Sequence, residues 1–176
     1  MSELSSPEML STYPEVRFDV YKLVEVEPTI ETAAQQAITS VWKKHMKEPV
    51  SVELIFASHL VIDLDDGTKD TVNSAFNPEG DKILIAIDTI TERHSAGLLD
   101  YLVVLQAAHE ARRLVQKKIG DPAPHSGTTM ANGTYLEDRH EDEAWQSAID
   151  AFSDIYPELL FEFSVGSNNY STHHQE

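Results

Sequence analysis

The chain has 176 residues, no cysteine, and 13 Lys and Arg against 30 Asp and Glu, which gives a formal net charge of −17. The length suits one domain that buries its own core. Without cysteine there can be neither disulfides nor thiolate metal sites, so a transition-metal site would use His and carboxylates. The negative charge repels phosphates and anionic lipids, which argues against direct binding of nucleic acid or membranes.

The two ends of the chain read as unstructured. Residues 1–14 are polar and lack the basic and apolar regions of a secretory signal, and no apolar run has the length that a bilayer requires. We therefore expect a cytoplasmic protein with a flexible arm over 1–14, a single domain over 15–165 and a flexible tail over 166–176.

A helix and a small sheet are predicted first. Thr29 can cap a helix that reaches His45, because apolar residues recur there at spacings of three and four. Alternation over 51–56 indicates a strand, and turn signals at 65–67 and 77–80 bracket further extended segments. The strand at 82–87 is apolar on both faces, so we expect it to be covered on each side or to border a cleft. The pattern predicts an α/β (α+β) fold with a small mixed or antiparallel sheet.

Two further helices follow. The first runs from about Ser95 or Gly97 to Ile119, and Gly120 is suited to a left-handed cap at its end. The stretch 121–135 reads as a loop. The last helix begins at 138–141 and ends near Tyr156, with a phase that turns Glu141 inward among apolar residues.

The segment His109-Glu110-Ala111-Arg112-Arg113 lies on the first of these helices, and Glu141-Asp142-Glu143-Ala144 opens the second. They resemble the H-E-x-x-H and E-x-[EQ]-A motifs of the minimal zincin core, closest to the ImmA/IrrE-like group of small metallopeptidases, over about residues 83–152. The resemblance implies a zinc peptidase that acts on a protein or peptide. By it, His109 is the first ligand position, Glu110 the general base, Glu141 the third ligand position and Glu143 a supporting carboxylate.

Arg113 departs from this pattern, because it stands where the second histidine belongs and has no lone pair for a metal. Two alternatives remain open. Arg113 can replace the metal by bridging Glu110 to Glu141 or Glu143, or His140 can join His109 and Glu141 around zinc if Arg113 swings outward. For His109, the alternative to metal binding is a buried or half-buried histidine paired with a carboxylate.

Tyr135 lies in the loop before the last helix and is a candidate for stabilising an oxyanion, or for anchoring the loop. Three functions are then expected. One is a zincin-like metallopeptidase with an impaired zinc site, which pairs a peptide with the exposed edge of the 83–87 strand. Another is an inactive zincin-fold binding or regulatory module whose acidic surface recruits a basic partner. The third is an acidic mimic of nucleic acid.

Overall fold

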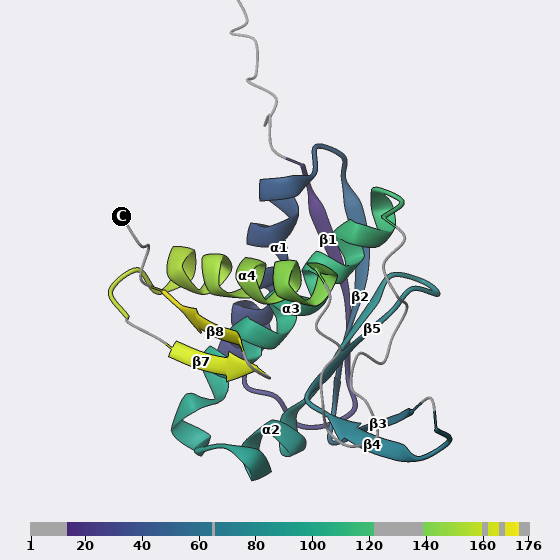
Figure 1. Ribbon diagram of the computed structural model, residues 1–176, viewed down its shortest axis with the longest axis vertical. Helices are drawn as coiled ribbons and strands as arrows, with labels where there is room; N and C mark the ends of the chain where they lie inside the picture. The colour runs from purple at the N-terminus through teal and green to yellow at the C-terminus, as the bar shows by residue number, and fades with distance from the viewer. Residues whose placement is uncertain (1–13, 65, 122–138, 160–161, 166–167, 173–176) are drawn as a thin grey trace, which may run out of the picture.

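The computed structural model combines helices with strands and describes residues 14–64, 66–121, 139–159, 162–165 and 168–172 (Figure 1). The helices are α1 Pro28–His45, α2 Ile87–Arg93, α3 Leu99–Lys118 and α4 Arg139–Ile155, with a 3-10 turn at Ala96–Leu98. The strands are β1 Val16–Lys22, β2 Val50–Ala57, β3 Leu60–Asp63, β4 Lys69–Val72, β5 Ser74–Asn77, β6 Lys82–Ala86, β7 Glu162–Val165 and β8 Asn168–Ser171. The predicted α/β fold is confirmed. None of the described helices has the length and apolar character needed to cross a membrane.

The main sheet has four strands in the order β1-β2-β6-β5. Strands β1, β2 and β6 are parallel, and β5 runs antiparallel to β6 at the edge. The remaining strands form two hairpins, β3-β4 and β7-β8. Since β6 lies between β2 and β5, the prediction that it offers an exposed edge to a peptide is wrong.

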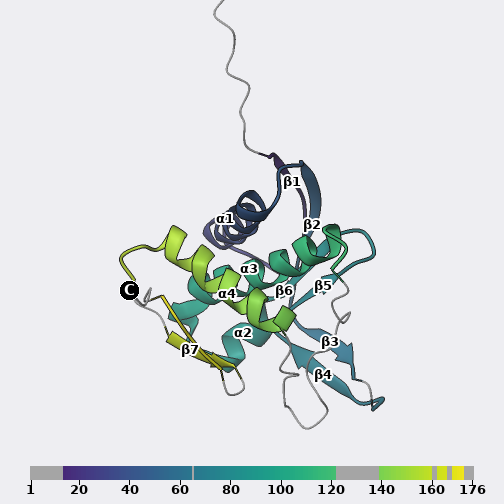
Figure 2. The same cartoon turned by 45° about the horizontal axis from the view of Figure 1, so that its top comes forward.

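One face of this sheet carries the core. Alternate residues of β2 and β6, among them Leu54, Phe56 and Ile83, are fully buried on the side of the helices. Figures 1 and 2 show α1, α3 and α4 on that side. No described helix covers the other side, where Leu84 is only partly buried. Ala86 on that same side is fully buried, so the apolar strand at 82–87 is covered on its second face only at its end.

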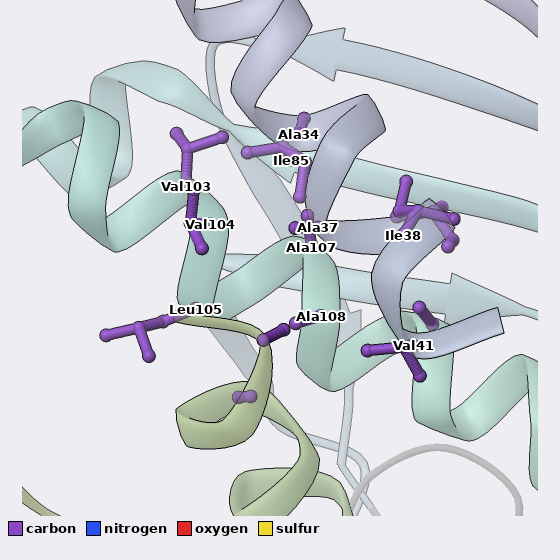
Figure 3. Close-up of a cluster of buried hydrophobic side chains, with 14 of the residues drawn as sticks. Ala34, Ala37, Ile38, Val41, Ile85, Val103, Val104, Leu105, Ala107 and Ala108 are labelled. Carbon is purple, nitrogen blue, oxygen red and sulfur yellow. The ribbon is translucent and has the colours of Figure 1, made fainter. Parts of the chain in front are cut away.

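Helices α1 and α3 pack closely because small side chains line both of them. Ala34 and Ala37 of α1 and Ala107 and Ala108 of α3 are completely buried in one cluster with residues of the sheet (Figure 3). Alanines allow the two backbones to approach, and they leave little room for larger groups. This contact fixes α3, and with it the candidate site, above the sheet.

The observed boundaries correct the predictions at several places. Helix α1 begins at Pro28, and its N-cap residue is Glu27, whose side chain makes no capping hydrogen bond. Thr29 is therefore not the cap. Strand β1 was not predicted. The tail contains β8, whose Tyr170 is buried and donates a hydrogen bond to Asp142 Oδ1 at 2.7 Å, so the prediction of a flexible tail is wrong at 168–171.

A buried charge cluster between two helices

Four charged side chains meet where α4 packs on α3. His109, Glu110 and Arg113 come from α3, and Glu141 comes from the first turn of α4. His109, Glu110 and Glu141 are 7%, 5% and 5% exposed. Residues one turn apart on a helix share a face, which is why His109 and Arg113 both reach Glu141. The inward phase predicted for Glu141 is confirmed.

His109 contacts a carboxylate with each of its ring nitrogens. Nε2 lies 3.0 Å from Glu141 Oε2, and Nδ1 lies 3.2 Å from Glu110 Oε1. An ionised carboxylate only accepts hydrogen bonds, so both nitrogens are placed to donate. The Trp145 ring lies against the imidazole, with centroids 4.2 Å apart and a 36° angle between planes. His109 is thus held between two acids and an aromatic ring.

Arg113 supplies the second cation. Its Nη2 contacts Glu141 Oε1, while His109 takes the other oxygen of the same carboxylate. The Arg113 side chain is 11% exposed. Counting His109 as the imidazolium, the cluster holds two cations and two anions, so its charges balance within a region from which water is largely excluded.

Strand β5 closes the cluster on the side of the sheet. Ser74 Oγ lies 2.6 Å from Glu110 Oε1 and 2.7 Å from Gln106 Oε1, and its single hydrogen serves one of them at a time. Burial raises the pKa of Glu110, but the charge of His109, the hydrogen bonds from His109 and Ser74, and the charge of Arg113 outweigh it. The pKa of Glu110 therefore lies below its ordinary value of 4.5. No sequence signal pointed to Ser74.

A second polar group lies further along the same two helices. Glu143 accepts hydrogen bonds from Arg112 Nη2 at 3.2 Å and Gln116 Nε2 at 3.4 Å. The ring of His140 turns to Asp121, with Nε2 2.7 Å from Oδ1, and its carbonyl accepts from Gln116 at 3.1 Å. His140 therefore does not join His109 and Glu141. Tyr135 lies outside the described residues.

The residues present do not fit a zinc ion. Arg113, at the position that the resemblance gives to the second ligand, carries a guanidinium, which has no lone pair and repels a dication. Glu141 and His109 Nε2, which would both have to face a metal, face each other. In the part of the chain that the structure describes, no three His, Asp or Glu side chains are arranged to hold a metal ion.

The chain has no match among protein-family models, among curated proteins or among solved structures.

Proposed function

We propose that this protein is a zincin-fold domain in which the Arg113 guanidinium stands in for zinc, and that it works as a binding or regulatory module and not as a peptidase. The observation that carries the proposal is the contact of Arg113 with Glu141 at the position of the second metal ligand. A cation that belongs to the chain satisfies the acid that a zincin would use as its third ligand.

The arrangement of elements supports the zincin part of the proposal. A mixed sheet with an antiparallel edge strand precedes α3, and α4 packs across α3 so that Glu141 meets His109 although 32 residues separate them. In a zincin, the first histidine and the acid of the following helix converge in the same way on one metal. Here they converge on each other and on Arg113.

The state of Glu110 supports the loss of activity. A general base works best when its pKa lies near the operating pH. The pKa of Glu110 lies below 4.5, and its Oε1 is already shared by Ser74 and His109. Such a carboxylate is a weak proton acceptor at neutral pH, and Glu110 fits a structural ion pair better than a catalytic role.

The metal content of three purified proteins, the wild type and two variants, tests the proposal. We expect the wild type to hold no stoichiometric zinc by mass spectrometry and to melt at the same temperature with chelator or added zinc. Arg113→His restores the ligand and is expected to bind about one zinc per chain and to melt higher with zinc. Arg17→His, an exposed position on β1 paired with Glu15, is the matched control and should do neither.

Two results would count against it. Stoichiometric zinc in the wild type, lost with chelator together with thermal stability, would favour a working metallopeptidase. An Arg113→His variant that folds but binds no zinc would remove the support for a zincin site.

The expected partner is a basic protein or peptide, because the net charge of −17 attracts cationic surfaces and repels nucleic acid. Its binding should weaken steeply as salt rises.

A further inference from the structure

The side of the main sheet that no described helix covers has an apolar row across it. Register places Tyr21 beside Ile55, Ile55 beside Leu84, and Leu84 beside Ala75, so one side chain from each of the four strands lies in line. Tyr21 is 50% exposed, and the other three are partly buried. We call this side the open face.

The open face carries little net charge in a strongly acidic protein. Within the four strands its charged side chains are two cations and two anions, namely Arg17, Lys82, Asp19 and Glu53, and Glu15 just before β1 pairs with Arg17. Lys82 Nζ lies 3.0 Å from Glu53 Oε2. The whole chain carries −17, so nearly all of the net negative charge lies elsewhere. Two copies of this protein repel each other in general, and the open face is where that repulsion is weakest.

We propose that two copies pack through their open faces, about a two-fold axis that runs parallel to the strands between β2 and β6. Rotation about this axis reverses the strand order of the second copy, so that β1 lies opposite β5 and β2 lies opposite β6. Each row of side chains keeps its level along the strands and therefore faces the same row of the other copy. Ile55 then faces Leu84 of the other copy. Tyr21, the largest side chain of the row, faces Ala75, the smallest. In the neighbouring row Glu53 faces Lys82, so the face is complementary to itself in size and in charge.

The area suits a weak dimer. Four strands about 4.8 Å apart and about five residues long at 3.3 Å each give a footprint of roughly 300 Å². Because side chains make the surface uneven, its accessible area exceeds this flat footprint. The two copies together therefore bury on the order of 1,000 Å² of accessible surface, near the lower bound for a specific interface. We therefore expect dissociation in the micromolar range.

Sedimentation equilibrium of the full chain at physiological salt tests the dimer. The wild type should pass from monomer to dimer as its concentration rises through the micromolar range. Leu84→Asp should weaken the dimer at least about tenfold, and Tyr21→Asp, which changes an exposed residue, should do so without disturbing the fold. Val61→Asp, at a 59% exposed position on β3, is the control and should leave it unchanged.

Charge exchange tests the axis. Glu53→Lys places like charges opposite each other and should weaken the dimer at least about tenfold. Adding Lys82→Glu reverses both charges and should restore association to within a few fold of the wild type. A wild type that stays monomeric throughout overturns the proposal. A dimer that survives Tyr21→Asp and Glu53→Lys, or a double variant of unchanged fold that stays weakened, also overturns it.

Discussion

Arg113→Met removes the cation that faces Glu141 but keeps a side chain of similar length. Removing one partner of a buried ion pair costs about 3–5 kcal/mol, because the other charge is left behind. We expect the lower end, about 3 kcal/mol, since His109 still contacts Glu141 and Arg113 is 11% exposed. For a chain of this length that corresponds to a fall in melting temperature of about 6–12 °C.

Urea unfolding followed by tryptophan fluorescence and circular dichroism measures this loss. Arg139→Met is the matched control, because Arg139 is also paired with an acid but is 70% exposed, and its loss should cost about 0–1 kcal/mol. In a double variant with Glu141→Gln, the loss should be smaller than the sum of the two single losses. If Arg113→Met costs no more than Arg139→Met, the guanidinium does not hold the cluster together and our reasoning fails.

Three other substitutions examine acid stability, the C-terminal hairpin and the helix contact. The low pKa of Glu110 gives the folded protein a stability that is complete above about pH 4.5 and is lost as the pH falls. Glu110→Gln lacks this carboxylate, so its urea midpoint should fall less steeply below that pH than the midpoint of the wild type. Tyr170→Phe removes the hydrogen bond to Asp142 and should cost about 1.5–3 kcal/mol in the same unfolding assay. Ala37→Leu forces extra atoms between α1 and α3 and should cost about 1–3 kcal/mol, whereas Leu at the exposed Gln36 should cost little.

Each of these has an outcome that contradicts it. An unchanged acid limb in Glu110→Gln would mean that this carboxylate is no more acidic in the native state than in the unfolded chain. A loss below about 0.5 kcal/mol in Tyr170→Phe would mean that β8 docks on α4 without that bond. Equal losses of unfolding free energy for Leu at positions 36 and 37 would mean that α1 and α3 are not tightly packed against each other.

Helical phase was the sequence signal that transferred best to the structure. Glu141 could be placed inside because Ala144, Trp145 and Ala148 follow it on the same face, and all four are buried. The end of α3 was predicted equally well, since Gly120 adopts a φ of 71° as a left-handed cap. Both features depend only on residues close in sequence, which is why they could be predicted.

Features that depend on distant residues were harder to predict. Strand β1 is an exception, because the alternation of Val16, Phe18 and Val20 with polar neighbours is a local signal of a strand that was not among the predictions. Ser74 is different, because a serine in a short strand says nothing about Glu110, which lies 36 residues away. The orientation of the His140 side chain could not be predicted either, since only the fold brings Asp121 within 2.7 Å of its ring.

The contact between Arg113 and Glu141 has a consequence for how stability depends on surroundings. A bound metal stabilises a protein by an amount that rises with its free concentration, so such a protein weakens when the metal is scarce. The guanidinium is joined to the chain and is always present at the same effective concentration. The packing of α4 on α3 is therefore expected to be as firm in a medium stripped of metals as in one rich in them.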